Sequence, residues 1–291
     1  MLSQGGILTA MLPTLDLTHD RATLVSQLSQ AFEQTGFLVV TGHGVPKEIM
    51  SEMWTISRAF FGIPAEYKTE LRMTPDYPYG YMGLTAEALQ QGQADCKESF
   101  CIGPADPAAG LPARRWPECD GFVKAWADYY AEMEKLSLRL LALMSLALDQ
   151  EEGWFATQMN HHASALRALR YPAGIGTAGE HTDYGLLTLL WAPAPGLQIK
   201  VRQGEWMEAP ACEGDFIVNV GDMLQRWTND RWLSTPHRVV PTETWRQSIA
   251  YFCNPSLNAI VDSLPGEVSK YPPVRAGYYL LARHDAATGA A

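Results

Sequence analysis

The segment His181-Thr182-Asp183 places a histidine and a carboxylate two residues apart. On a β-strand, positions i and i+2 point to the same face, so both side chains would reach one metal ion. His237 follows after strand-rich sequence that can fold back beside this pair. Two imidazoles and one carboxylate on one face of an octahedron leave adjacent positions open, the ligand set of oxygen-activating iron(II) enzymes. We therefore interpret His181, Asp183 and His237 as a catalytic iron(II) site.

The remaining histidines offer other candidates for the third ligand. The sequence contains seven histidines, and a His-x-Asp pair taken alone is a common pattern that usually binds no metal. His43 lies between glycines in a turn, and His161 and His162 follow a helix-like segment. We favour structural or surface roles for these three, which leaves His237 as the preferred partner of the pair.

The segment Arg246-Gln247-Ser248, soon after His237, suggests a second element of the site. On a strand, Arg246 and Ser248 share a face. A planar guanidinium beside a hydroxyl suits a carboxylate, because its fork can bind both oxygens. A dicarboxylate such as 2-oxoglutarate needs a metal for its keto-acid end and a cation for its far carboxylate, and the sequence offers both. An arginine seen alone on a strand is more often part of a surface ion pair.

The first half of the chain is predicted to be mainly helical. Residues 12–16 indicate a short opening strand, after which Leu24, Leu28 and Phe32 recur on one face of a helix that Gly36 ends. A long helix is predicted over residues 122–148, where apolar residues recur at steps of three and four. We interpret that stripe as core packing.

The second half is predicted to consist of strands. Residues 75–119, rich in Pro and Gly, are predicted to be irregular, and short strand-like runs begin near residue 165. These runs cover residues 186–190, 197–201, 216–220 and 248–252, with a hairpin at Gln203-Gly204. The fold class is therefore α+β, and the second half is a jelly-roll candidate.

Composition and charge exclude several classes of partner. Apolar residues make up 47% of the 291 positions and charged residues 19%, which is ordinary for a globular protein. The net charge of -10, with no Lys/Arg cluster, argues against nucleic-acid binding, which relies on basic residues. No apolar run approaches the length of a membrane span, so we expect no membrane partner either.

Cysteine usage and the N-terminal sequence bear on the cellular compartment. The five cysteines are odd in number and include no CxxC pair, which argues against a disulfide framework and a structural zinc site. No Lys or Arg precedes Arg21, so we predict no signal peptide. A reducing cytoplasm fits best. Nothing in the sequence indicates the oligomeric state.

With these motifs in view, the chain resembles the isopenicillin N synthase-like family of iron(II)/2-oxoglutarate-dependent dioxygenases. The likeness covers nearly the whole chain, and the triad and the Arg-x-Ser motif have the family's spacing. The other matching segments are Leu12-Pro13-Thr14-Leu15-Asp16, Gly36-Phe37, His43-Gly44-Val45-Pro46, Asp95-Cys96-Lys97-Glu98-Ser99-Phe100, Asn219-Val220-Gly221-Asp222-Met223-Leu224, Trp227-Thr228-Asn229 and Ser234-Thr235-Pro236-His237-Arg238-Val239.

The resemblance implies a fold and a division of the chain. The fold would be a double-stranded β-helix, or jelly roll, flanked by helices. Residues 1–118 would form an N-terminal dioxygenase region that packs on the core. Residues 119–291 would form the dioxygenase core, with the long supporting helix and a C-terminal lid segment.

The resemblance also assigns roles at the site. The triad would bind Fe(II), with 2-oxoglutarate and O2 as co-substrates, and Arg246 and Ser248 would hold the distal carboxylate. Tyr171 matches the tyrosine of the family's Asn-Tyr-Tyr-Pro motif, which helps to hold the co-substrate. Leu169 stands where that motif has its Asn. One hydrogen bond to the co-substrate would therefore be missing, unless Arg167 or Arg170 supplies it.

The implied reaction is the oxidation of an unactivated C–H bond of a small organic substrate, with release of succinate and CO2. Hydroxylation, desaturation and cyclisation are all known outcomes in the family, and family analogy suggests specialised metabolism. One alternative is an iron oxidase of the same fold that uses no 2-oxoglutarate. No Gln follows Gln247 to supply the extra ligand of isopenicillin N synthase, which weakens that version. The other alternative is a metal-dependent binding or sensor protein without catalysis.

Few residues suggest themselves for the substrate pocket. Phe252 shares a strand face with Arg246 and Ser248 by alternation, so we expect it to line the cavity. Tyr81 and Phe100 are weaker candidates. A C-terminal helix over residues 273–283, which carries Tyr278 and Tyr279, would lie over the pocket mouth.

Overall fold

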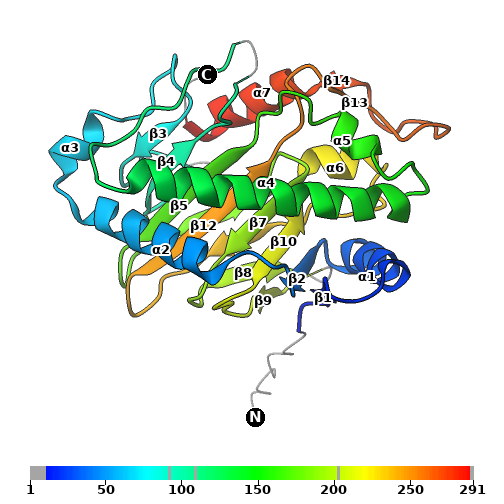
Figure 1. Cartoon of the computed structure of the whole chain (residues 1–291), viewed down its shortest axis with the longest axis horizontal. Coiled ribbons are helices and arrows are strands. Elements are labelled where there is room, and N and C mark those ends of the chain that lie inside the picture. Colours follow the sequence, from blue (N-terminus) through cyan, green and yellow to red (C-terminus); the bar gives the residue numbers. More distant parts are fainter. Residues whose placement is uncertain (1–10, 91–92, 108–109, 202–203, 289–291) are drawn as a thin grey trace.

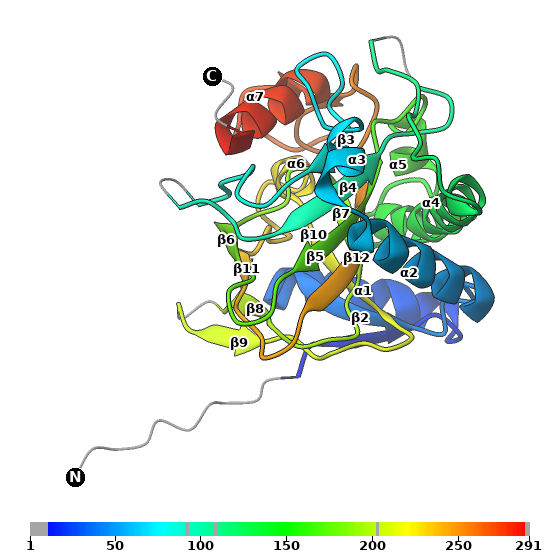
Figure 2. The ribbon, with the colours of Figure 1, turned by 90° about the vertical axis from the view of Figure 1, so that its left-hand side faces the viewer.

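The computed structural model describes residues 11–90, 93–107, 110–201 and 204–288. These residues form three layers, in which helices cover one face of a large β-sheet and a small sheet lies on its other face (Figures 1 and 2). Apolar side chains from both sheets meet between them, among them Val39 and Ile217 of the large sheet and Ile199 and Val239 of the small one. The fold is the predicted α+β jelly roll.

The large sheet has eight strands in the described residues, in the order β1-β2-β10-β7-β12-β5-β4-β3. Neighbouring strands are antiparallel except for β1 and β2, which run parallel. The strands span Thr14–Asp16 (β1), Phe37–Thr41 (β2), Gly80–Met82 (β3), Glu98–Ile102 (β4), Ala165–Tyr171 (β5), Leu187–Trp191 (β7), Phe216–Val220 (β10) and Arg246–Cys253 (β12).

The small sheet has four strands in the described residues, in the order β6-β11-β8-β9. They span Ala178–His181 (β6), Leu197–Lys200 (β8), Trp206–Glu208 (β9) and His237–Val239 (β11). A separate pair joins Ile260–Val261 (β13) to Val274–Arg275 (β14). The small sheet is the shorter wall of the jelly roll, and its strands β6 and β11 carry two of the predicted metal ligands.

The helices are distributed between the outside of the large sheet and the open ends of the roll. They span Arg21–Gln34 (α1), Lys47–Gly62 (α2), Ala65–Thr69 (α3), Phe122–Ala147 (α4), Trp154–Thr157 (α5), Asp222–Trp227 (α6) and Ala276–Thr288 (α7). Helices α1, α2 and α4 lie over the outer face of the large sheet, whereas α7 lies apart from them (Figures 1 and 2).

The main core forms where α4 crosses the large sheet. The predicted apolar stripe of α4 is buried, and Trp126 packs edge-on against Phe100 of β4, which in turn contacts Phe60 of α2. Burial of a large apolar side chain contributes about 1.5–3 kcal/mol. The helical layer therefore stabilises the sheet that carries most of the site.

Most predicted elements are confirmed, and the main error lies between residues 75 and 119. That segment contains β3 and β4, two short strands that pair with each other and, through β4, with β5. The first helix ends as predicted before Gly36, whose φ of 69° suits glycine, and a Cβ there would lie 2.0 Å from the Leu233 carbonyl oxygen.

Four other predictions concern a hairpin, a signal peptide, the division of the chain and membrane spans. Strands β8 and β9 are antiparallel neighbours, but Gln203 of the predicted hairpin lies outside the described residues, as do residues 1–10 of the stretch searched for a signal peptide. The division at residue 118 remains a prediction, since strands from both sides of it share the large sheet. No helix within the described residues is long and apolar enough to span a membrane.

Candidate active site

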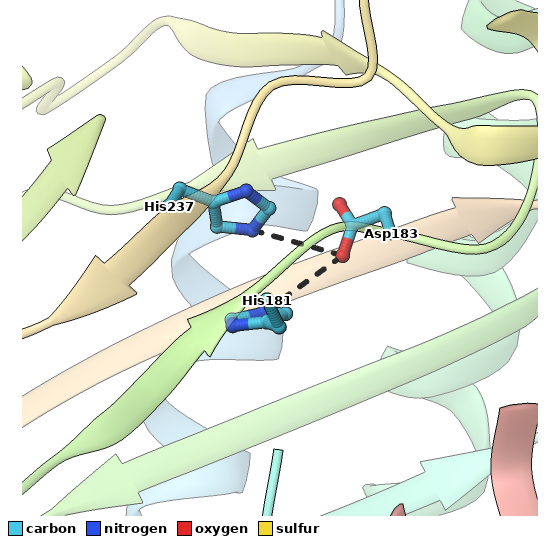
Figure 3. A group of neighbouring side chains, drawn as sticks. All are labelled: His181, Asp183 and His237. Carbon is cyan, nitrogen blue, oxygen red and sulfur yellow. Dashed lines mark ion pairs between the residues drawn. The ribbon is translucent and has the colours of Figure 1, made fainter. Parts of the chain in front are cut away.

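The three predicted metal ligands meet in the space between the sheets. His181 ends β6 and His237 begins β11, and the two residues are paired in register across these antiparallel strands. Asp183 lies just beyond β6, in the connection to β7, so the expectation that it shares a strand with His181 is wrong. The connection still directs its carboxylate toward both histidines (Figure 3).

The distances within the triad suit a single metal ion. One oxygen of Asp183, Oδ1, lies 4.0 Å from Nε2 of His181 and 3.7 Å from Nε2 of His237. One ligand atom from each residue can be chosen so that all three lie within 4.8 Å of one another. With ligand bonds of about 2.0–2.2 Å, neighbouring ligand atoms on one octahedral ion lie about 3 Å apart, so a small inward movement of the side chains would close the set on an ion. The three residues therefore form a two-histidine, one-carboxylate set that faces a common point.

Hydrogen bonds to the outer atoms fix each ligand in this orientation. The second oxygen of Asp183 accepts hydrogen bonds from Thr188 of β7 and Asn219 of β10, the latter at 2.8 Å. Nδ1 of His181 lies 2.7 Å from the Gly179 carbonyl, and Nδ1 of His237 lies 3.1 Å from the carbonyl of the residue two positions earlier. Because a carbonyl only accepts, each Nδ1 carries the proton and each Nε2 keeps its lone pair for a metal.

Electrostatics favour the charge states that bind metal. Burial by itself raises the pKa of Asp183, but the facing imidazoles of His237 and His181 and two side-chain hydrogen bonds outweigh it and lower that pKa overall. Burial, aided by the neighbouring His237, lowers the pKa of His181 well below its usual value. An ionised carboxylate and a neutral imidazole are the forms that ligate a metal ion.

Arg246 of β12 points into the same space between the sheets. It is only 2% exposed, and its Nε donates to the Pro195 carbonyl at 3.0 Å while NH1 donates to the hydroxyl of Ser248 at 3.1 Å. NH2 is also buried, and it has no hydrogen-bond partner among the described residues. A buried cation with an unused donor is costly unless an anion completes it. The site therefore fits a carboxylate at this point.

Tyr171 lies beside this arginine, as the sequence predicts. It is the residue of β5 paired with Arg246 across the sheet, and the guanidinium lies 5.1 Å from the centre of its ring. Neither of the two arginines considered as a substitute for the missing family Asn is free for that role. Arg170 points to the opposite face and pairs with Glu98 at 2.8 Å, and Arg167 uses its guanidinium on Glu87 and Ser99.

The predicted pocket residues divide between the two faces of the large sheet. Phe252 is partly buried and packs against the apolar cluster between the sheets, on the same face as Arg246. Tyr81 and Phe100 lie on the opposite face, in the core beneath the helices, which corrects their assignment to the pocket. The hydroxyl of Tyr81 donates to Glu98, and its ring contacts Phe60.

Helix α7 confirms the predicted C-terminal helix and lies near the triad. Arg283 donates from NH2 to the Thr182 hydroxyl at 3.1 Å and forms an ion pair with Asp222 at 3.0 Å. Tyr279 donates to the same Asp222 carboxylate at 3.1 Å, whereas Tyr278 is 69% exposed. The helix thus contacts the residue between the first two ligands.

Sequence reasoning missed the residues that hold the ligands in place. It assigns no role to Thr188 or Asn219, although Asn219 lies in one of the segments that match the family. A signal is present, because β10 reads Phe-Ile-Val-Asn-Val and a buried amide in an apolar strand needs a partner. Which partner it has depends on the pairing of β10 with β7, and the sequence does not specify that pairing.

Comparison with known proteins agrees with this geometry. Residues 12–119 match the family of the non-haem dioxygenase in morphine synthesis N-terminal region, and residues 156–255 match the 2OG-Fe(II) oxygenase superfamily. The chain is 31% identical over 288 residues to the 2-oxoglutarate-Fe(II) type oxidoreductase hxnY of Emericella nidulans, covering 87% of this chain and 82% of that protein. It is 28% identical over 316 residues to validamycin A dioxygenase of Streptomyces hygroscopicus subsp. limoneus, with coverage of 95% and 87%.

Solved structures resemble the whole fold. The structure of a full-length Neurospora crassa protein in complex with alpha-KG and thymine superposes with a TM-score of 0.83 at 27% identity, over 98% of each chain. The structure of JOX2 in complex with 2OG, Fe and JA gives a TM-score of 0.85 at 25% identity, over 96% of this chain and 86% of that chain.

Proposed function

This chain belongs to the 2OG-Fe(II) oxygenase superfamily, and from that premise we propose that its site oxidises an unactivated C–H bond of a small organic substrate. The protein is an iron(II)- and 2-oxoglutarate-dependent oxygenase that uses O2 as a co-substrate. The outcome we propose is hydroxylation, desaturation or cyclisation, with release of succinate and CO2. Where the substrate hydrogen lies in the pocket decides between these outcomes.

The observation that carries this proposal is the unused donor of Arg246. Its buried NH2 group has no partner in the described residues, and it lies in the same space between the sheets as the triad. We assign iron(II) to His181, Asp183 and His237, and the distal carboxylate of 2-oxoglutarate to Arg246 and Ser248. Iron(II) bound there would supply the activation of O2 that is coupled to decarboxylation of 2-oxoglutarate.

The protein's own side chains would hold and orient the reactants. Asp183 keeps one oxygen free because Thr188 and Asn219 bind the other, and Tyr171 supports the clamp by stacking beside the guanidinium of Arg246. Phe252, further along the same face of β12, would form an apolar wall on the substrate side. These residues position reactants and exclude water, while the chemistry belongs to the cofactor.

The substrate class is proposed only as a small organic molecule. Structures similar to this one contain thymine or JA, and a relative is named for validamycin A, so the scaffold accepts chemically different small molecules. Nucleic-acid or membrane partners are not part of the proposal. We place the enzyme in the cytoplasm and in specialised metabolism, in keeping with its cysteine usage and its family.

The test is release of succinate in a screen of candidate metabolites with iron(II), 2-oxoglutarate and O2. We expect a true substrate to raise succinate release and O2 uptake in equal amounts above the substrate-free background. Oxygen uptake without succinate would favour the 2-oxoglutarate-independent oxidase. Tight binding of metal and co-substrate, without turnover of any of a broad range of compounds, would favour a sensor.

A further inference from the structure

Four charged side chains form a buried chain beside the triad. Arg167 of β5 donates to Glu87 from NH1 and NH2, each at 3.1 Å. Glu87 also forms an ion pair with Lys97 at 2.9 Å. Lys97 also pairs with Asp95. The exposed fractions of these side chains are 15% for Arg167, 11% for Glu87, 3% for Lys97 and 1% for Asp95. We call this set the charge chain.

Stability alone does not explain the charge chain. Removing charges from water is costly, and well-packed apolar residues often stabilise a core as well as buried ion pairs do. The set is balanced, with two positive and two negative groups, so it carries no net charge to attract an ionic substrate. What it offers is a connection with defined geometry between its two ends.

One end of the charge chain holds the strand that bears a metal ligand. Oδ1 of Asp95 accepts a hydrogen bond from the backbone N–H of Gly179 at 2.8 Å, and the carbonyl of Gly179 in turn lies 2.7 Å from Nδ1 of His181. A Cβ at Gly179 would lie 2.6 Å from the Cβ of Gln90, so the segment bearing Asp95 packs directly on β6. The backbone of a single residue, Gly179, thus lies between Asp95 and the imidazole of a ligand.

This contact matters because strand pairing holds β6 on one side only. It is an edge strand of the small sheet, with β11 on one side only. The pairing with β11 is irregular between its two matched positions, His237 with His181 and Val239 with Ala178. On the free edge, the backbone of β6 is held by Asp95, while the preceding residue, Thr177, exchanges two hydrogen bonds of 3.1 Å with Cys96.

The other end of the charge chain lies on the wall of the co-substrate clamp. Arg167 is on β5 and shares its inner face with Tyr171, and its Nε donates to Ser99 of β4 at 2.9 Å. The charge chain therefore spans from the strand beside the clamp to the strand that carries a ligand. Because β5 belongs to the large sheet and β6 to the small sheet, the charge chain links the two sheets through side chains.

We infer that Asp95 is a positioning residue for the iron site. The charge chain holds Asp95 in place, and Asp95 in turn fixes the position of β6 and orients the imidazole of His181. The inference rests on the proposed role of His181 as an iron ligand. Asp95 is not one of the proposed ligands, and it acts through the backbone of Gly179. Groups that orient ligands in this way typically change metal affinity about 10- to 100-fold when removed.

The experiment compares iron(II) affinity in a graded series at one position. Asp95→Ala removes the acceptor, and we expect the dissociation constant for iron(II) to rise about 10- to 100-fold. Asp95→Asn keeps an oxygen toward Gly179 but loses the charge, and we expect a rise of roughly fivefold, because a neutral hydrogen bond is weaker than a charged one. The measurement is anaerobic calorimetric titration with iron(II) alone.

A buried ion pair on the opposite face of the sheet provides the matched control. Lys68 and Glu98 pair at 2.8 Å with exposed fractions of 5% and 6%, and Glu98 directly follows Lys97 in sequence. Both Glu98→Gln and Asp95→Ala should lower the free energy of unfolding of the metal-free protein, because each removes a charge from a buried ion pair. Glu98→Gln should leave the iron(II) dissociation constant within about twofold, because Glu98 does not touch β6.

The outcomes separate this inference from the proposed function. An unchanged dissociation constant in Asp95→Ala, or an equal rise in Glu98→Gln, would overturn the positioning role while leaving the iron site itself intact. If Asp95→Ala does not fold, the Asn variant decides, and affinity equal to wild type would overturn the role. Absence of iron(II) binding by the wild-type protein would instead remove the proposed function and this inference together.

Discussion

The two faces of strand β12 serve different purposes with alternate residues of one short sequence. On the inner face, Arg246 and Ser248 turn toward the space between the sheets, where a guanidinium N–H has no partner among the described residues. On the outer face, Ile249 and Tyr251 join the apolar core beneath α4. All four side chains are buried, so burial alone does not distinguish them. What differs is the chemistry each pair presents: a guanidinium and a hydroxyl toward the space between the sheets, and mainly apolar surface toward the helices.

The same contrast holds across the large sheet. Its outer face buries aromatic rings that contact each other, such as Phe100 with Phe122. Its inner face buries Thr188 and Asn219, whose hydrogen bonds go to the ligand Asp183. Substitutions on the outer face should therefore act on folding stability, whereas those on the inner face should act on the binding of metal and co-substrate.

The largest effect should come from the triad. His237→Ala removes one of three ligands, and we expect iron(II) binding to weaken sharply and turnover to fall by at least about a thousandfold, since a bound metal contributes several kcal/mol to the reaction. The fold should survive, because the ring lies between the sheets and outside the main core. Anaerobic iron(II) titration and circular dichroism measure the two quantities.

A second histidine provides the control for that experiment. His43 contacts the Gly214 carbonyl at 2.8 Å and packs against Phe216, away from the triad. His43→Ala should bind iron(II) as wild type does. Wild-type affinity and activity in His237→Ala would remove His237 from the ligand set.

The next largest effect should come from Arg246. Truncating one partner of a buried charge-assisted pair typically costs about 2–5 kcal/mol. That corresponds to a roughly thirty- to several-thousandfold loss of 2-oxoglutarate affinity in Arg246→Ala. Arg246→Lys should recover only part of the loss, because an ammonium cannot make the planar two-point contact. The measurement is titration of the anaerobic iron(II) protein with 2-oxoglutarate, followed by the absorption band that chelation produces.

Iron(II) binding is the internal control for Arg246, because this arginine is not a ligand and its removal should leave the metal affinity unchanged. If Arg246→Ala takes up 2-oxoglutarate like the wild type, Arg246 is not the clamp. If the wild-type protein shows no band on adding 2-oxoglutarate, the inner face of β12 does not bind this co-substrate, and the proposed division of β12 into a binding face and a core face fails.

The sequence predicts the inner face of β12 well because alternation is local. The Arg246–Ser248 clamp and the long helix follow from the periodicity of residue types. The triad follows from residue type and spacing. Alternation does not say which face of a strand meets the helices, and for this reason the sequence wrongly places Tyr81 and Phe100 in the pocket. Their strands also escape prediction, because β3 and β4 have only three and five residues and are defined by pairing.

Contacts between distant segments are the part that the sequence cannot supply. Glu87 and Arg167 are both visible as ionisable residues, but they meet only because the connection between β3 and β4 folds back beside β5. Likewise, the bend after β6 that returns Asp183 to the histidines is not encoded in a two-residue spacing. Each of these contacts depends on how separate segments pair, and many partners of the right type compete for it.

The smallest and sharpest test of the contrast uses two neighbours on β12. Ser248→Ala removes the hydroxyl that accepts from NH1 of Arg246, and we expect roughly a fivefold loss of 2-oxoglutarate affinity, since one hydrogen bond contributes about 1 kcal/mol. Ile249→Val removes one methylene from the core and should lower the free energy of unfolding by about 0.5–1.5 kcal/mol. Each variant should leave the other's quantity nearly unchanged, as measured by anaerobic titration and by urea unfolding of the metal-free protein. Adjacent residues that differ in this way would show that the side of the strand, and not the depth of burial, separates binding from stability. Equal losses of 2-oxoglutarate affinity in both variants would mean that the outer core transmits strain to the clamp, and the division between the two faces would not hold.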